Sequence, residues 1–173
     1  MGPADYARRC VEALAHGEQT PLSPPDPLFG MRAACFVSIK KGGALRGCIG
    51  TLEAAEPDLA HEIIRNARCA ATQDPRFPAV TEDELPDLTY SVDVLSPSEP
   101  ADMDSLDPRR YGVIVECGVR RGVLLPDLPG VEDADYQVEV ALRKARIGPD
   151  EDFKLRRFTV TRYHEGDEIG RAH

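Results

Sequence analysis

A cysteine, an arginine and two glycines stand together in the stretch Leu45–Thr51, which reads Leu-Arg-Gly-Cys-Ile-Gly-Thr. A cysteine reacts as its thiolate, and a nearby cation favours that charged form. Glycines have no side chain, so Gly47 and Gly50 would let a ligand or another backbone approach Cys48 closely. This pattern predicts a site in which Cys48 is a candidate nucleophile or acceptor. Arg46 would then stabilise the thiolate or a bound anion.

Two other interpretations of this stretch stay open. Free cysteine is among the most buried residue types, so Cys48 could be a core residue whose flanking glycines let two layers pack. Alternatively, the stretch including Thr51 could line a cleft in a non-catalytic binding or adaptor module that holds a partner's peptide or a small molecule. A Cys-His mechanism needs a histidine within hydrogen-bonding reach, and nothing in the sequence places His61 or His164 there, so no acid–base pair is visible. We therefore favour binding over catalysis.

The segment Asp74-Pro75-Arg76-Phe77-Pro78 is the second candidate. Its two prolines restrict the backbone, which predicts a stiff, ordered loop. The Phe77 ring could anchor the loop, while Arg76 could project outward or brace a carboxylate. In the binding interpretation Asp74, Arg76 and Phe77 form a wall of the cleft. In the other interpretation the loop is a conformational clamp between a helix and a strand.

A β-hairpin is the element predicted to position Cys48. The segment 33–39 is rich in strand formers, and the paired glycines at 42–43 are typical of a tight hairpin turn. If 45–52 is the second arm, alternate side chains share a face. Arg46 and Cys48 are then expected to point the same way.

The rest of the chain predicts one α+β domain over residues 1–173, with mostly antiparallel sheet and about three main helices. The predicted elements are a helix at 3–15, a proline-rich connector at 21–27, a helix from about Pro57 to Ala71, a capped turn at 81–84, a strand at 88–95, a surface connector at 97–110, paired strands at 111–116 and 122–126, a helix capped by Asp133 or Asp135 and ended by Gly148, and a closing strand at 154–163. Arg120 and Arg121 are expected at the tip of a turn over 118–122.

Composition narrows the function classes. The 173 residues carry a net charge of -9, which disfavours a broad nucleic-acid-binding surface. No stretch is long and apolar enough to cross a bilayer, and the first residues lack a secretion signal. The five cysteines include no Cys-x-x-Cys pair and the four histidines are scattered, which argues against a disulfide framework and a metal site. We expect a cytoplasmic protein without a cofactor.

In its motifs the sequence resembles the AMMECR-one domain family. The stretch Leu45–Thr51 has the family hallmark without change. The similarity continues in order along nearly the whole chain, through Asp74–Pro78, Glu84–Leu88, Val92–Ser96, Gly122–Pro126 and Arg157–Tyr163. The segments Leu128–Val131, Gln137–Ala141 and Arg143–Ala145 are similar to the bacterial and archaeal members called AmmeMemoRadiSam system protein A, although Arg146 stands where glycine is common.

The resemblance implies two β/α repeats, usually described as a larger and a smaller lobe. It implies no particular activity, because none is settled for the family. The name of the bacterial and archaeal type implies, as possible partners, a radical S-adenosylmethionine enzyme and a Memo-like protein. The resemblance therefore predicts the fold more sharply than the function.

Overall fold

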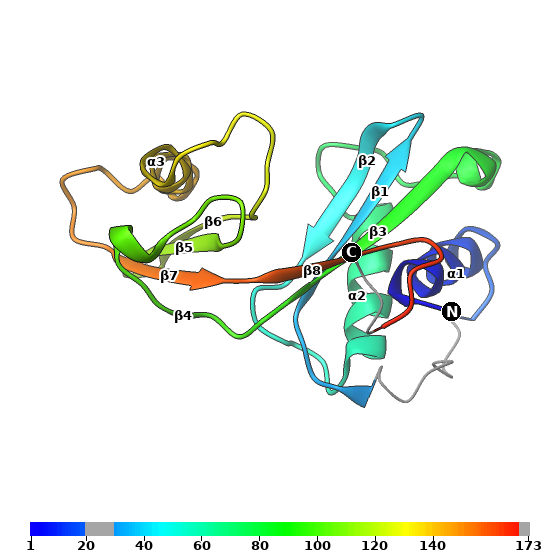
Figure 1. Ribbon diagram of the computed structural model, residues 1–173. Coiled ribbons are helices and arrows are strands. Elements are labelled where there is room, and N and C mark those ends of the chain that lie inside the picture. Colours follow the sequence, from blue (N-terminus) through cyan, green and yellow to red (C-terminus); the bar gives the residue numbers. More distant parts are fainter. Residues whose placement is uncertain (20–29, 170–173) are drawn as a thin grey trace. The chain divides into compact units, whose positions relative to one another are not determined.

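Two compact units make up the computed structural model, which describes residues 1–19 and 30–169. The larger unit comprises Met1–Leu95 with Thr161–His173, and the smaller unit comprises Ser96–Val160. Each contains a four-stranded sheet with helix packed on it (Figure 1). The described residues form three α-helices and include five antiparallel strand pairs, which confirms the α+β prediction. The expected connector at 21–27 lies outside the described residues.

The larger unit has the sheet order β2-β1-β3-β8. Its elements are α1 (Pro3–Ala15), β1 (Cys35–Lys41), β2 (Ala44–Gly50), α2 (Leu59–Thr72), the 3-10 helix η2 (Glu82–Asp87), β3 (Leu88–Leu95) and β8 (Val160–His164). Strand β1 pairs with both β2 and β3. The α1 and β3 bounds agree with the prediction, whereas α2 begins after Pro57 because the Asp58 side chain caps it by accepting from the His61 N–H.

Helices α1 and α2 cover one face of this sheet. Small side chains on the helices let them approach the strands closely, and the side chains between them are fully buried. These include Ala7, Cys10, Val11, Val37, Ile39, Ile63, Ala67 and Val92. By strand alternation, the neighbours of Val37 and Ile39 on β1 point to the opposite face. That opposite face carries the candidate site.

The smaller unit has the sheet order β4-β7-β5-β6. Its elements are β4 (Glu99–Pro100), the 3-10 helix η3 (Met103–Ser105), β5 (Gly112–Cys117), β6 (Arg120–Leu124), α3 (Ala134–Ala145) and β7 (Lys154–Phe158). Its core is formed by Val113, Val115, Leu124, Val138, Ala141, Leu142, Ala145 and Ile147. The segment 97–110, expected as a surface connector, is mostly exposed and contains β4 and η3.

Three predicted boundaries in the second half are wrong. The β5–β6 turn is the two residues Gly118 (φ 61°) and Val119, so Arg120 and Arg121 lie in β6 rather than at the tip. Helix α3 ends at Ala145, because Arg146 turns the chain in a left-handed conformation (φ 58°) before Gly148 is reached. The closing strand is divided into β7 and β8.

The two units repeat one arrangement, as the resemblance implied. Each has a hairpin, then a helix, then a third strand that pairs with the first strand of the hairpin, giving β2-β1-β3 and β6-β5-β7. Gly47 of β2 and Gly122 of β6 occupy matching places. An added Cβ would lie 2.2 Å from the Ala70 carbonyl oxygen of α2 at Gly47, and 2.1 Å from the Ala141 carbonyl oxygen of α3 at Gly122. Both glycines therefore let a helix pack directly on a strand.

Candidate functional site

A β-bulge changes how the hallmark stretch presents its side chains. Ile39 faces Gly47 and Lys40 faces Leu45, so Arg46 has no partner residue across the β1–β2 ladder. A bulge interrupts strand alternation and redirects a side chain. The expectation that Arg46 and Cys48 point the same way assumed a regular strand, and the bulge lies between Leu45 and Gly47.

Arg46 is 8% exposed and binds Glu84 of η2 instead. Its Nε and Nη2 donate to the two Glu84 carboxylate oxygens at 2.9 and 3.1 Å. The Arg46 guanidinium, followed by the Thr81 N–H, holds the pKa of Glu84 well below its usual range. The Glu84 carboxylate also accepts from Lys41 at 3.2 Å. Arg46 thus fixes the hairpin to the capped turn, and sequence spacing gave no sign of this partner.

The Cys48 thiol is partly buried and shares a hydrogen bond with the Ser38 hydroxyl, 3.2 Å away. Burial raises the pKa of this thiol, against a lowering by the Ser38 hydrogen bond. The positive charge that also lowers the pKa of Cys48 is that of Arg76, not Arg46. A raised pKa disfavours the thiolate, which is the nucleophilic form of cysteine.

The predicted Asp74–Pro78 loop lies directly beside Cys48. Asp74 is 3% exposed, and one of its oxygens (Oδ2) accepts the Cys48 N–H at 3.0 Å. Arg76 donates to the same carboxylate from Nε at 3.0 Å and from Nη2 at 2.7 Å. This contact holds the pKa of Asp74 well below its usual range. Arg76 therefore braces a carboxylate, which is one of the two roles the sequence left open for it.

Arg76 still reaches solvent, since 55% of its side chain is exposed. Its guanidinium carbon lies 5.5 Å from the centre of the Phe77 ring, and that of Arg46 lies 6.0 Å from the same ring. Such distances allow cation–π attraction. The structure thus brings Cys48, Asp74, Arg76 and Phe77 together, and the Arg46 guanidinium also lies near the Phe77 ring.

The side of the sheet that bears Cys48 is polar, and we call it the polar sheet face. Ser38 of β1 stands opposite both Cys48 of β2 and Ser91 of β3, so three small polar side chains form a row across three strands. In the next row Asp93 binds Arg162 of β8 at 2.7 and 3.1 Å. Sequence reasoning missed Ser38, Ser91 and Arg162 as site residues. The alternation of polar and apolar residues along β1 and β3 is the signal that could have found the two serines.

The other predicted binding residues make internal contacts. Gly47 makes room for α2, as described above. An added Cβ at Gly50 would lie 2.2 Å from the Phe36 ring, so this glycine makes room for an aromatic side chain. The Thr51 hydroxyl donates to Glu62 at 2.5 Å. None of these three contacts brings the residue to the thiol.

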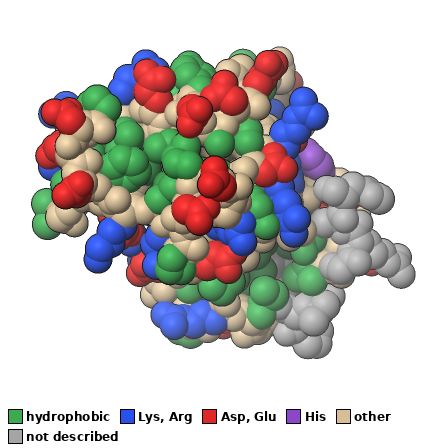
Figure 2. Space-filling model, turned by 60° about the vertical axis from the view of Figure 1, so that its left-hand side comes forward, with side chains coloured by type: hydrophobic (Ala, Val, Ile, Leu, Met, Phe, Trp, Pro, Cys, Tyr) green, Lys and Arg blue, Asp and Glu red, His purple; other side chains and the backbone are tan. Residues whose placement is uncertain are grey.

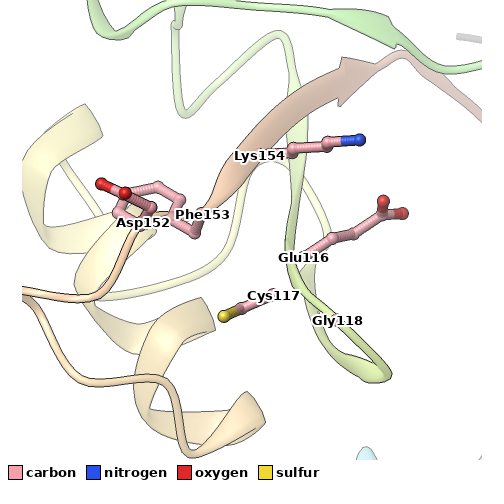
Figure 3. Close-up of a pocket in the computed structure, with 6 residues that line it drawn as sticks. All are labelled: Glu116, Cys117, Gly118, Asp152, Phe153 and Lys154. Atoms are coloured by element: carbon pink, nitrogen blue, oxygen red, sulfur yellow. The ribbon is translucent and has the colours of Figure 1, made fainter.

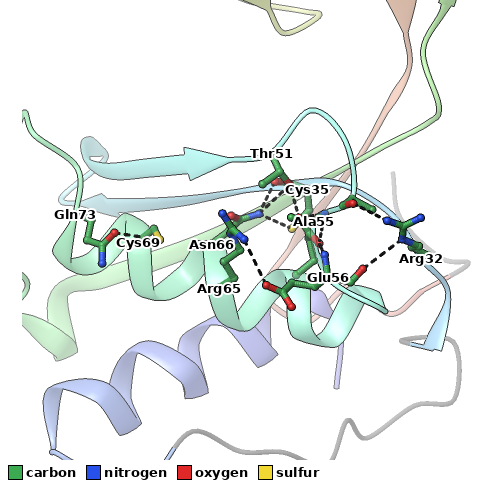
Figure 4. Close-up of polar contacts among 11 residues, drawn as sticks. Arg32, Cys35, Thr51, Ala55, Glu56, Arg65, Asn66, Cys69 and Gln73 are labelled. Atoms are coloured by element: carbon green, nitrogen blue, oxygen red, sulfur yellow. Dashed lines mark hydrogen bonds and ion pairs between the residues drawn. The ribbon is translucent and has the colours of Figure 1, made fainter.

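Glu62 is a fully buried carboxylate that sequence reasoning missed. It accepts from the Thr51 hydroxyl and from the backbone N–H groups of Ala55 and Glu56, the latter at 2.8 Å. One turn further along α2, the Asn66 amide donates to the Cys35 carbonyl oxygen at 2.9 Å (Figure 4). These polar residues fix the segment after β2 to the helix. Their positions within the apolar stripe of α2 were the available sign of burial.

A cavity of about 340 Å³ lies in the smaller unit. It is lined by Glu116, Cys117, Gly118, Asp152, Phe153 and Lys154, and Cys117 and Phe153 point away from the side to which Glu116 and Lys154 extend (Figure 3). Arg120 donates to the Cys117 sulfur at 3.3 Å and pairs with Glu151. Over residues 1–19 and 30–169 no group of three metal-ligating side chains was found, and no helix there is long and apolar enough to cross a membrane.

Comparison with known proteins places the chain. The chain is 54% identical over 144 residues to a Thermotoga maritima protein, covering 82% of this chain and 83% of that one. It is 47% identical over 148 residues to a Clostridium acetobutylicum protein, covering 86% of this chain but only 32% of that longer protein.

The fold is also found in a solved structure. The crystal structure of an uncharacterized protein from Pyrococcus horikoshii superposes with a TM-score of 0.87 at 30% identity, covering 99% of this chain and 93% of that one. The profile of the AMMECR1 family matches residues 4–166. The chain therefore belongs to the AMMECR1 (AMMECR-one) family.

Proposed function

We propose that this chain is a non-catalytic binding or accessory component that docks a partner protein on its polar sheet face, beside Cys48 and Arg76. The observation that carries the proposal is that the charged groups around the partly buried Cys48 thiol are already paired with one another. The pairs are Arg46 with Glu84, Arg76 with Asp74 and Arg162 with Asp93. Such pairs hold their hydrogen-bonding groups in fixed positions, which favours recognition.

The alternative is an enzyme that uses Cys48 as nucleophile or acceptor. That chemistry needs a thiol with a lowered pKa and a base within hydrogen-bonding reach. Burial raises the pKa of Cys48 instead. Among the described residues its sulfur has a hydrogen bond only with Ser38, so no histidine is hydrogen-bonded to it. Both observations favour binding over catalysis.

A protein partner is favoured over a small molecule, because the row of small polar side chains runs across three strands rather than into an enclosed pocket. The Clostridium acetobutylicum relative supports this, since the matching region is about a third of that protein and is joined there to further polypeptide. The resemblance to the AmmeMemoRadiSam type suggests a cytoplasmic radical S-adenosylmethionine enzyme or Memo-like protein as the partner. We propose no nucleic-acid partner, since acidic side chains are interspersed with basic ones on the face in view (Figure 2).

The test is isothermal titration calorimetry. The purified chain is titrated with the radical S-adenosylmethionine enzyme of the same organism and, separately, with its Memo-like protein. Saturable binding to either protein is the expected result. Ser91→Arg, which places a long charged side chain on the polar sheet face, should weaken that binding at least tenfold. Thr72→Arg adds the same charge at an exposed position on α2 and should leave the affinity unchanged.

Two results would contradict the proposal. The first is that neither protein binds, even at concentrations 100 times the Kd values typical of specific complexes. The second is that Ser91→Arg binds as tightly as the parent chain, which would place the docking surface elsewhere.

A further inference from the structure

Strand β2 is the outermost strand of its sheet, and such a strand presents backbone groups that could pair with another chain. In β2 these groups include the N–H and the C=O of Cys48. Both bond to side chains of the Asp74–Pro78 loop rather than to β1. The exposed edge of the sheet is therefore occupied at this residue.

Asp74 and Arg76 make the hydrogen bonds to Cys48 that a neighbouring strand would make. The Asp74 carboxylate accepts the Cys48 N–H at 3.0 Å, and Arg76 Nη2 donates to the Cys48 carbonyl oxygen at 3.4 Å. Engaging both backbone groups of one residue is what a facing residue does in an antiparallel ladder. Because Arg76 also holds Asp74 through two hydrogen bonds, the acceptor and the donor form one rigid cap.

The loop does not create a new edge in place of the one it covers. Pro75 and Pro78 have no backbone N–H to offer. The Arg76 N–H donates to the Asp74 carboxylate at 3.1 Å, and the Phe77 N–H donates to the Asp74 carbonyl oxygen at 3.1 Å. Residues 75–78 therefore have no free backbone donor, since two lack an N–H group and the other two donate within the loop.

The smaller unit has a matching feature. Val123 follows Gly122 in β6 as Cys48 follows Gly47 in β2, and β6 is also an outermost strand. The Val123 carbonyl oxygen accepts from Lys144 of α3 at 3.0 Å. A basic side chain thus takes the outward carbonyl at the same place in both repeats.

We propose that Asp74 and Arg76 are an edge cap that prevents β2 from pairing with β2 of a second copy of this chain. Without the cap, two copies could join antiparallel about a two-fold axis, each contributing the same strand. The edge cap shares Asp74 and Arg76 with the proposed docking site, but the two proposals are tested separately. The test of the edge cap measures self-association of this chain, whereas the test of the proposed function measures binding of a partner protein.

The double variant Asp74→Ala/Arg76→Ala tests the edge cap. Removing both partners avoids leaving one buried charge unpaired. Light scattering after gel filtration, over a concentration series, should show a molar mass that rises to twice that of the parent chain. The matched control Glu139→Ala/Arg143→Ala removes an exposed ion pair from α3 and should keep the parent mass.

Adding Leu45→Lys to the double variant should restore the parent mass, since a lysine on an outermost strand opposes pairing. Leu45 is an exposed residue of β2. If circular dichroism shows that the double variant is unfolded, Asp74→Asn/Arg76→Ala keeps an acceptor for the Cys48 N–H while freeing its carbonyl. The molar mass of that variant should also rise as its concentration is increased. A folded variant that keeps the parent mass throughout, or an association that Leu45→Lys does not reverse, overturns the proposal.

Discussion

At the scale of single residues, the chemistry of Cys48 is decided by the residues that surround it in space rather than by those next to it in sequence. Arg46, two positions away, is turned to Glu84, whereas Arg76, on a distant loop, acts on the thiol. Burial outweighs that favourable charge and raises the pKa of Cys48. The hallmark motif therefore holds a partly buried thiol with a raised pKa among paired polar groups.

The first prediction distinguishes the effects of Arg76 and Arg46 on the pKa of Cys48. Arg76→Gln should raise the apparent pKa of Cys48 further, because it removes a positive charge and leaves the Asp74 carboxylate without its counter-charge. Arg46→Lys should leave the pKa of Cys48 unchanged. The measurement is the rate of alkylation at Cys48 as a function of pH, with the modified residue located by mass spectrometry. Cys10, whose pKa burial raises to about 12, is the internal control that stays unmodified in the folded protein. A plateau of reactivity at Cys48 below pH 8 in the parent chain would contradict the raised pKa of this thiol.

A second prediction concerns acid stability. Arginine contacts hold the pKa values of Asp74 and Glu84 well below the values near 4 expected in the unfolded chain. Groups with a lowered pKa stabilise the fold above the unfolded value, and this stability is lost as pH falls through the folded one. The free energy of unfolding should therefore decrease as pH falls below about 5. In Glu84→Gln that decrease should be smaller, as urea titrations between pH 3 and pH 7 can measure. An equal pH dependence in both chains would exclude this role for Glu84.

The candidate site was partly predictable from sequence. Two prolines were enough to predict an ordered loop at Asp74–Pro78, and the residue types limited Arg76 to two roles. The partner of Arg46 was not predictable, because a bulge is a property of two paired strands and only the register reveals it. Glu62 was missed because a buried carboxylate depends on backbone donors that only the folded loop supplies.

At the scale of elements, the glycines in the two hairpins set how closely a helix can approach. In Gly47→Ala and Gly122→Ala the new methyl group would meet a helix carbonyl oxygen, and backbone cannot move aside as a flexible side chain can. Each substitution should lower the free energy of unfolding by about 1–3 kcal/mol, the usual cost of overpacking. Thermal and urea unfolding measure this cost. Gly30→Ala, where the added Cβ meets no atom within 4 Å, is the control and should be close to neutral. A neutral Gly47→Ala would contradict the close packing of α2 on β2.

The end of α3 carries a further prediction. Arg146 adopts a left-handed conformation, which glycine adopts without steric cost and other residues do not. Because the Arg146 side chain is exposed, Arg146→Gly should stabilise the protein, by about 0.5–1 kcal/mol. Glu139→Gly, in the middle of the same helix, should destabilise it by about 1 kcal/mol. The free energy of unfolding from urea titration decides between these signs, and a loss of stability in Arg146→Gly would refute the argument.

Elements with strong local signals were predicted well, and those that depend on distant contacts were not. Helix α1 and strand β3 have regular apolar spacing and agree with their predicted bounds. The β5–β6 turn was misplaced because either Gly118 or Gly122 could mark a turn in the sequence. Only the packing of α3 shows that Gly122 belongs in the strand. The division of the closing strand depends on Ser96 and Thr159, whose hydrogen bonds join segments far apart in sequence.

At the scale of the whole molecule, the smaller unit is an insertion between β3 and β8 of the larger one. Each unit has its own buried apolar cluster, with no residue shared between the two. The start and the end of the insertion lie together, because the Ser96 N–H donates to the Thr159 carbonyl oxygen at 2.9 Å and the Thr159 N–H donates to the Ser96 hydroxyl at 2.9 Å. The chain can therefore leave and rejoin the larger unit at one place.

This geometry predicts that the larger unit folds without the smaller one. Replacing residues 97–158 by a Gly/Ser linker of about four residues should preserve the larger unit, since the two ends to be joined are already in contact. The shortened chain should show helical circular dichroism and a cooperative thermal transition, because its core keeps Val37, Ile63 and Val92 fully buried. Cys10 should stay protected from alkylation until that transition. The matched deletion of residues 36–50 removes all of β2 and all of β1 except Cys35, and it should abolish the transition. A shortened chain that lacks a cooperative transition and alkylates at Cys10 in buffer would show that the larger core depends on the insertion.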